Sequence, residues 1–236
     1  MSDIDLICYY EEVPSPATFD AVLHEVGAVV TGVISPPGPE GFGTRYSVEG
    51  IELQTGGTPV DSIETRLERI AAGNVDWMTA KVAMGMMDGI ALHGDDLIRS
   101  WKQRAAYPES LRRREVEANI RIFAIWRADA QLVARDAELF RRQMLVEGAF
   151  RVAAVLSAVN RLYFSSFQFK RAGEHFARMA LKPERVSERL DVVANASPAI
   201  AAEELRTLVE ETREIVRNEM PEVDVDAPWQ PLRDGR

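Results

Sequence analysis

The spacing of the apolar residues changes near Asp61, and this change limits the folds open to the chain. Before it, short apolar runs over residues 4–10 and 28–34 are separated by breaks rich in proline and glycine, a pattern typical of strands and turns. After it, apolar residues recur every three or four positions almost to the end, which is the period of an amphipathic helix. The sequence therefore predicts an α+β protein, with a small mixed β-sheet followed by a C-terminal helical bundle.

Turn residues divide the first part of the chain into short elements. Ser15 before Pro16 favours a helix start, because serine caps a helix and proline suits its first turn. Proline and glycine are so dense over residues 36–41 that we expect a loop there. The predicted elements are a strand over 4–10, a helix from Ser15 to Gly27, a strand over 28–34, and two short strands or one bulged strand at 46–48 and 51–54 around Gly50.

The pattern of the sequence after Asp61 predicts helices, and its breaks indicate the domain limits. Tyr107 and Pro108 indicate a break, and Pro221 opens a tail rich in proline and aspartate. We expect a sheet domain over residues 1–75, a helical domain over 76–220 and an irregular tail over 221–236. The helical stretches expected after the break are a charged amphipathic one over 111–136, an apolar one over 137–162, and two more over 171–182 and 199–219.

Composition excludes several classes of protein. The net charge of −9, from 28 basic and 37 acidic residues, argues against a broad nucleic-acid surface, which needs clustered Lys and Arg. No apolar run is long enough to span a bilayer, and no basic segment precedes an apolar one at the start, so no membrane partner and a cytoplasmic location are expected. The single cysteine, Cys8, excludes an internal disulfide, and three scattered histidines exclude the usual Cys/His zinc site.

Two aspartates in the first strand indicate a metal site. Residues two apart in a strand face the same side, so Asp3 and Asp5 would project together while Ile4 and Leu6 face a core. Adjacent carboxylates repel each other, and Mg²⁺ is commonly held by one or two carboxylates together with substrate phosphates. A third ligand is expected from Glu52, because glutamate is uncommon inside an apolar strand. The alternative for Glu52 is an exposed position on an edge strand.

These residues resemble the polymerase-beta-like nucleotidyltransferase superfamily. The matching segments are Ser-Asp-Ile-Asp-Leu-Ile at residues 2–7 and Gly-Ile-Glu-Leu at 50–53. Glu147, the segment Leu-Ser-Ala-Val-Asn-Arg-Leu-Tyr-Phe at 156–164, and Lys170 are similar to the helical domain of small bacterial members, among them relatives of the aminoglycoside and lincosamide enzymes. The resemblance covers roughly residues 2–190 and is moderately specific only when its segments are combined.

The resemblance implies that a nucleoside monophosphate, AMP from ATP, is transferred to a hydroxyl of a small molecule or protein. It implies two Mg²⁺ ions held by three carboxylates, those of Asp3, Asp5 and Glu52. Asn160, Tyr163 and Lys170 would lie near the nucleotide, with the lysine as a point charge on a phosphate. The alternative for Asn160 and Tyr163 is an ordinary helix end. Glu147 would be a general base or, alternatively, a solvated charge or salt-bridge partner.

Two departures from the family pattern leave other interpretations open. The family carries a Gly-Ser motif shortly before its acidic pair, and the given chain starts after that point, so the sheet domain is expected to be truncated at its N-terminus. Many relatives carry the third carboxylate where this chain has Gln54. The alternatives are a degenerate binding module, such as an antitoxin-like partner of another protein, or a late gene start in a longer enzyme. An uncovered strand at residues 4–10 also favours a homodimer.

Overall fold

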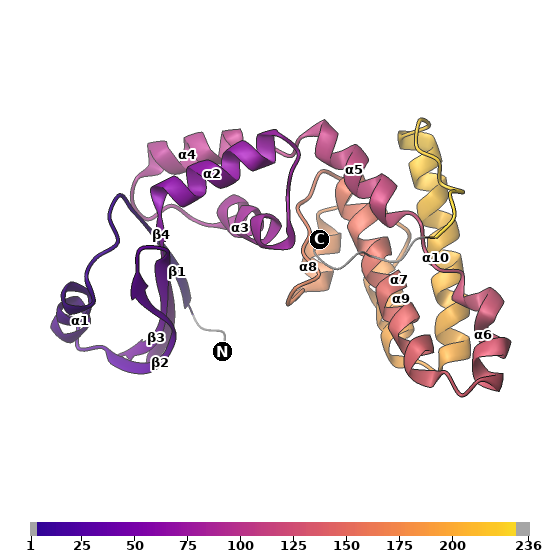
Figure 1. Ribbon diagram of the computed structural model, residues 1–236, viewed down its shortest axis with the longest axis horizontal. Helices are drawn as coiled ribbons and strands as arrows, with labels where there is room; N and C mark the ends of the chain where they lie inside the picture. The colour runs from indigo at the N-terminus through magenta and orange to yellow at the C-terminus, as the bar shows by residue number, and fades with distance from the viewer. Residues whose placement is uncertain (1–3, 230–236) are drawn as a thin grey trace. The chain divides into compact units, whose positions relative to one another are not determined.

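The computed structural model describes residues 4–229 and confirms an α+β protein, with a four-stranded mixed sheet and many helices (Figure 1). Asp3, a predicted metal ligand, lies outside the described residues. The chain divides into two compact units, Met1–Arg69 and Ile70–Arg236, which we call the sheet unit and the helical unit. The division falls in the last turn of α2 (Val60–Ala71), a few residues before the predicted limit at 75.

The sheet unit contains four strands in the order β1-β4-β3-β2. β1 runs parallel to β4, and the other neighbouring strands are antiparallel. The strand predicted over 4–10 and the helix predicted after Ser15 are confirmed, and the Ser15 hydroxyl accepts a hydrogen bond from the Thr18 amide at 3.2 Å. The elements are β1 (Ile4–Tyr10), α1 (Pro16–Glu25), β2 (Val29–Gly38), β3 (Gly41–Val48) and β4 (Ile51–Pro59).

The short strands predicted around Gly50 are two longer strands of one hairpin. Glu49 and Gly50 form its turn with φ angles of 51° and 81°. Positive φ at both central residues gives a two-residue turn the twist that matches its flanking strands. The hydroxyls of Tyr46 and Thr55 lie 2.7 Å apart in a buried position and join β3 to β4. This hydrogen bond holds β4 to β3, and β1 pairs with the other side of β4.

The prediction of a loop over residues 36–41 is wrong for the first half of this range. β2 continues through Pro36 and Pro37, and only Pro39 and Glu40 form the turn. β2 is one of the two edge strands of the sheet, and its register with β3 shifts near these prolines. Proline is tolerated at edges and bulges, because no neighbouring strand needs its missing N–H.

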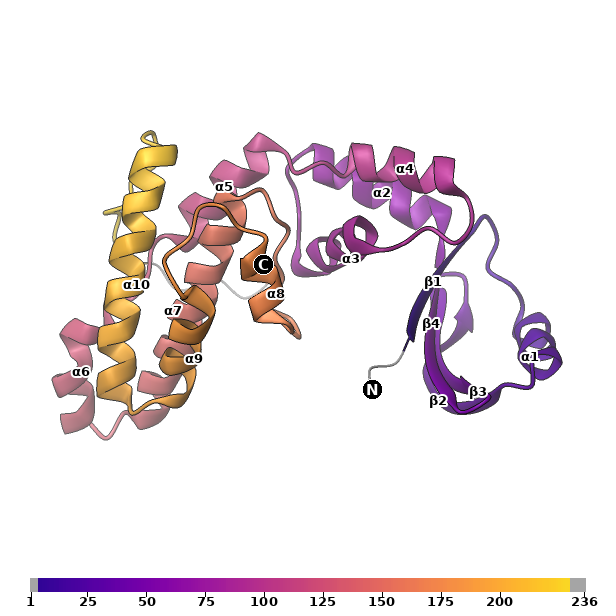
Figure 2. The same cartoon turned by 180° about the vertical axis from the view of Figure 1, so that it is seen from behind.

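α1 covers one face of the sheet, as the two opposite views show (Figures 1 and 2). Phe19 of α1 packs on Phe42 of β3 with their ring centroids 4.5 Å apart, and Leu23 of α1 is buried. The Phe42 ring also lies over Gly57 of β4, where a Cβ atom would come within 2.0 Å of the ring. β4 therefore needs glycine at this point for α1 and the sheet to share one core.

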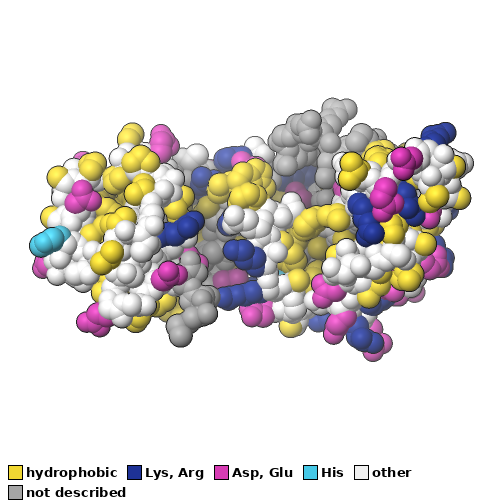
Figure 3. Space-filling model, turned by 90° about the horizontal axis from the view of Figure 1, so that it is seen from below, with side chains coloured by type: hydrophobic (Ala, Val, Ile, Leu, Met, Phe, Trp, Pro, Cys, Tyr) yellow, Lys and Arg dark blue, Asp and Glu magenta, His cyan; other side chains and the backbone are white. Residues whose placement is uncertain are grey.

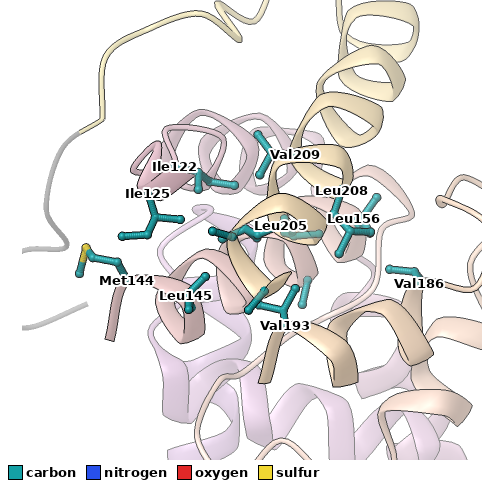
Figure 4. Packing of buried hydrophobic residues seen from close by; sticks show 14 of the residues in the cluster. Ile122, Ile125, Met144, Leu145, Leu156, Val186, Val193, Leu205, Leu208 and Val209 are labelled. Carbon is teal, nitrogen blue, oxygen red and sulfur yellow. The ribbon is translucent and has the colours of Figure 1, made fainter. Parts of the chain in front are cut away.

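The helical unit is organised around α7 (Glu138–Val159). α7 packs against α5, α9 and α10, and its residues Leu145 and Leu156 are fully buried with Leu205 and Leu208 of α10 (Figure 4). α7 and α10 approach each other closely at Gly148, where a Cβ atom would lie 2.6 Å from Cδ2 of Leu205. The other helices are α3 (Trp77–Asp88), α4 (Asp95–Arg104), α5 (Glu109–Asn119), α6 (Ile125–Ala134), α8 (Ala172–Ala177), α9 (Val186–Asn195) and α10 (Pro198–Glu219).

The amphipathic stretch predicted over 111–136 is divided between α5 and α6. Between these helices the chain turns inward, and Ile120 and Ile122 are buried. The Arg151 guanidinium of α7 donates to the carbonyls of Ala118 at 3.3 Å and Arg121 at 2.8 Å. Backbone carbonyls at the end of α5 thus accept hydrogen bonds from α7, a helix some thirty residues further along the chain, and these bonds stabilise the break.

One further expectation for the helical unit needs correction, and the tail adds an observation that the sequence did not predict. The helix predicted over 171–182 is only the short α8, and α9 was not expected. The tail described over residues 221–229 has neither helix nor strand, as predicted, yet Val223 and Val225 are buried against the ends of α5, α7 and α10. Within residues 4–229, no helix is long and apolar enough to cross a membrane.

Candidate functional site

The parallel pairing of β1 with β4 places two predicted ligands on one face of the sheet. Asp5 is the register partner of Gln54, and register partners point to the same side of a sheet. Glu52 precedes Gln54 by two residues and therefore shares this side. Asp5 and Glu52 are both exposed. We call this side the open face, because Gly57, which lies under Phe42 on the α1 side, alternates with Gln54 along β4.

The open face also carries a positive charge. Arg45 of β3 is the register partner of Gln54, so Arg45, Gln54 and Asp5 form a row across three adjacent strands. Arg45 is exposed. β3 and β1 are two strand spacings apart, about 10 Å, so only the long side chain of Arg45 brings its guanidinium toward an anionic group bound near Asp5.

Asp5 and Glu52 are the two predicted magnesium ligands that lie on the open face. Neither Asp5 nor Glu52 forms a hydrogen bond or ion pair with another described side chain. Mg²⁺ keeps several waters and is usually bound by one or two carboxylates plus substrate phosphates. Among residues 4–229 no cluster of three or more His, Cys, Asp or Glu side chains could hold a metal ion. On the open face, the described residues therefore supply Asp5 and Glu52 but no third acidic ligand beside them.

A groove of about 490 Å³ opens elsewhere on the sheet unit, where β1 and β4 end. Its lining contains three acidic residues, Glu11, Glu12 and Asp61, together with several prolines. Asp5, Glu52 and Gln54 do not line it. The groove and the open face are therefore separate features.

The helical unit has its own polar cavity, of about 60 Å³, between α3 and residues 161–178. This volume admits a few waters or one phosphate- or carboxylate-sized group, since a water needs about 10–15 Å³ by such a measure. Ion pairs hold Arg178 to Asp88 at 2.9 Å and Arg161 to Glu109 at 2.9 Å. The cavity is lined by Met84, Met87, Asp88, Tyr107, Arg161, Leu162, Tyr163, His175 and Arg178.

A buried hydrogen bond fixes the tautomer of His175 in this cavity. The Ser157 hydroxyl donates its only hydrogen to the Ala153 carbonyl at 2.7 Å, so it can only accept from Nε2 of His175, 2.9 Å away. Neutral His175 therefore carries its proton on Nε2 and leaves Nδ1 as an acceptor. Burial of the ring, helped by the charge of Arg178, lowers the pKa of His175 below its usual value.

Two tyrosines complete the lining. Tyr163 donates a hydrogen bond to the carbonyl of Ala105 at 2.9 Å, and its ring packs on Tyr107 with centroids 4.9 Å apart. Burial raises the pKa of Tyr163 to about 12 and also raises the pKa of Tyr107. Both phenols therefore stay protonated near neutral pH and neither can act as a base, and Tyr163 already gives its only hydrogen to the Ala105 carbonyl.

The structure distributes the residues predicted in the helical unit among different roles. Tyr163 lines the cavity, while Lys170 is exposed between α7 and α8 and has no partner among the described residues. Asn160 uses its whole side chain internally: it donates to the carbonyls of Leu156 and Leu181 and accepts from the amides of Ala180 and Leu181, at 2.7–3.0 Å. It ties the end of α7 to residues 180–181.

Glu147 takes the alternative role that the sequence left open for it. Its carboxylate accepts from Nε of Arg151 at 2.9 Å, and this arginine is 2% exposed. Glu147 is thus the partner of a buried guanidinium rather than an exposed group awaiting a substrate.

Comparisons with known proteins add no identification. No family model, no curated protein and no solved structure matches the chain. The sequence did not single out Asp88, His175 or Arg178 as site residues. Asp88 and Arg178 lie ninety residues apart, and Ser157 and His175 lie eighteen apart. No local spacing connects such pairs, so only the tertiary structure brings them together.

Proposed function

We propose that the chain is a Mg²⁺-dependent nucleotidyltransferase, which moves AMP from ATP to a hydroxyl of a small molecule or a protein. The observation that supports this best is the parallel register of β1 and β4. It brings Asp5 beside Gln54 and puts Glu52 on the same exposed side of the sheet. A pair of carboxylates on adjacent strands is the arrangement that the residue pattern led us to expect of a nucleotide-bound metal.

The proposed reaction needs positioning and charge neutralisation more than covalent help from the protein. The acceptor oxygen bonds to the α-phosphorus, the bond from that phosphorus to the bridging oxygen breaks, and pyrophosphate leaves while the hydroxyl proton passes to a base. Bound Mg²⁺ would supply charge neutralisation on the phosphates. Asp5 and Glu52, with Asp3 outside the described residues, would hold the metal, and Arg45 would bind a phosphate oxygen.

The sequence resemblance also implies nucleotide contacts at three residues of the helical unit. Lys170 offers an exposed ammonium, and Tyr163 stands in a cavity sized for one phosphate group. Asn160 would act by positioning, since its side-chain amide is already used to hold residues 180–181. A Lys170→Gln variant should therefore weaken nucleotide binding without changing the stability of the fold.

The test is Mg²⁺-dependent binding of a fluorescent ATP analogue to the full chain. Asp5→Asn and Glu52→Gln should each weaken binding at least tenfold, and only when Mg²⁺ is present. The matched control is Asp20→Asn, which removes an exposed carboxylate from α1, on the other side of the sheet. Unchanged Mg²⁺-dependent affinity in both site variants would refute the proposal.

A second candidate function, a binding module without catalysis, is favoured by one observation. The residue in register with Asp5 is Gln54, a neutral amide at a position where the sequence resemblance implies a carboxylate. If the site has lost an anionic ligand there, Gln54→Glu should raise Mg²⁺-dependent nucleotide affinity. Absence of nucleotide binding by both the natural chain and the Gln54→Glu variant, with a stoichiometric protein partner in copurification, would favour the binding module instead.

A further inference from the structure

The two edges of the sheet differ in a way that points to an interface. The β2 edge is interrupted by Pro36 and Pro37 and by shifts of register. Prolines and bulges of this kind prevent one edge strand from pairing with another. The β1 edge has seven regular residues, Ile4–Tyr10, without proline or glycine, and each is in continuous register with β4. No other described strand pairs with the outer side of β1.

Apolar side chains also reach the surface along β1. Ile4 is 48% exposed and Ile7 is 58% exposed, and they point to opposite faces of the strand. Figure 3 shows many apolar side chains at the surface of the sheet unit, on its left. A strand that is regular, unpaired on one side and apolar on both faces is suited to receive a further strand.

We propose that β1 pairs antiparallel with β1 of a second copy of this chain, so that two sheets join into one eight-stranded sheet. A two-fold axis that relates two antiparallel strands stands perpendicular to the sheet and preserves its faces. Residues that face each other then have numbers of the same parity, because register partners share a face. Only a few registers are therefore possible for a strand as short as β1.

The register centred on Ile7 is the one in which every described residue of β1 has a partner in the second copy. It pairs all seven described residues, whereas centring on Leu6 or Cys8 pairs only five and centring on Asp5 pairs only three. Centring on Asp5 would also set two like charges directly opposite each other, which destabilises a sheet. The pairs in the favoured register are Ile4 with Tyr10, Asp5 with Tyr9, Leu6 with Cys8, and Ile7 with itself.

The pattern of β1 therefore fits its own copy. Each apolar side chain meets an apolar or aromatic one, and each Asp5 meets the ring of Tyr9 rather than a second carboxylate. Aromatic and branched cross-strand pairs stabilise antiparallel sheets. A strand that is self-complementary about its central residue is what a two-fold interface requires.

The first test measures the mass of the full chain by size-exclusion chromatography with light scattering. A dimer is expected for the natural chain, and a monomer for Ile7→Lys, which sets two ammonium groups opposite each other. Ile51→Lys is the matched control, because Ile51 is 53% exposed on β4 and the variant should stay dimeric. A monomeric natural chain, or an Ile7→Lys variant that remains dimeric, would overturn the proposal. Circular dichroism verifies that each variant is folded.

The second test fixes the register with the natural Cys8 and mild oxidation. Leu6→Cys should give a disulfide-linked dimer, because residue 6 then faces Cys8 of the second copy. The combined Leu6→Cys, Cys8→Ser variant should not crosslink. Crosslinking of the natural chain would instead indicate a register centred on Cys8, and crosslinking of the combined variant one centred on Leu6. Either result would overturn the register, and a Leu6→Cys variant that stays uncrosslinked would do the same.

Discussion

The close approach of α7 and α10 can be tested by adding one methyl group at Gly148. A Cβ atom at this position would lie 2.6 Å from Cδ2 and 3.3 Å from Cδ1 of Leu205, and 3.5 Å from Cγ2 of Ile122. Carbon atoms prefer separations of about 3.5–4.0 Å. Leu205 is fully buried, so its side chain cannot move away without disturbing the surrounding core.

Two opposing effects set the size of the change in Gly148→Ala. Alanine in place of glycine inside a helix stabilises the helix by about 1 kcal/mol. Overpacking of a closely packed core destabilises by about 1–3 kcal/mol. We expect the packing effect to win, because the overlap with Leu205 is close to 1 Å, and the variant should be about 1 kcal/mol less stable than the natural chain.

Gly85 of α3 provides the matched control. Apart from the neighbouring residues and the backbone of α3 itself, no atom lies within 4 Å of a Cβ built at Gly85, so Gly85→Ala should stabilise by about 0.5–1 kcal/mol. The free energies of unfolding are measured with urea, followed by far-UV circular dichroism. Leu205→Ala provides a further check, since it removes the atoms that overlap, and the cost of Gly148→Ala should then disappear. Equal stabilisation by Gly148→Ala and Gly85→Ala would refute the reasoning.

Two other predictions concern buried charged groups. Arg151→Ala leaves the carboxylate of Glu147 and two backbone carbonyls without their hydrogen-bond donor, so the free energy of unfolding in urea should fall by about 3 kcal/mol. A loss below about 1 kcal/mol would contradict the role assigned to Arg151. Because burial lowers the pKa of His175 in the folded chain, the unfolded chain takes up this proton first as the pH falls. Stability should therefore be lost as the pH drops below about 6.5. His175→Gln, which keeps a donor for Ser157, should lose less stability between about pH 7 and pH 5 than the natural chain, and an identical loss would contradict the assignment.

The local sequence pattern was enough to predict the strands and helices that have clear capping residues or a clear apolar stripe. Ser15 and Pro16 start a helix as expected, and the apolar residues Ile63, Leu67 and Ile70 are buried along α2. α9 was missed because only Val186 and Val193 of its residues are buried, which is too weak a stripe to recognise. The break between α5 and α6 depends on Arg151, a residue outside both helices, so it has no local signal.

The candidate site was predictable only as far as strand alternation reaches. Glu52 and Gln54 share a face by simple alternation, but their position beside Asp5 depends on a pairing between strands some forty residues apart. Asn160 matched a motif, yet its amide binds the backbone of residues 180–181. Sequence shows which polar groups are present, and only tertiary structure shows which of them are already used.

The strand pairing that builds the open face also determines when this face can form during folding. The β3–β4 hairpin closes over two residues, Glu49 and Gly50, and hairpins of this kind form within microseconds. β1 pairs with β4 across a long intervening chain, and such distant parallel pairings form slowly because the chain must first lose much of its freedom. We therefore expect Asp5 to reach Glu52 only late in folding. A newly synthesised chain would carry a finished hairpin well before Asp5 and Glu52 share one face of the sheet.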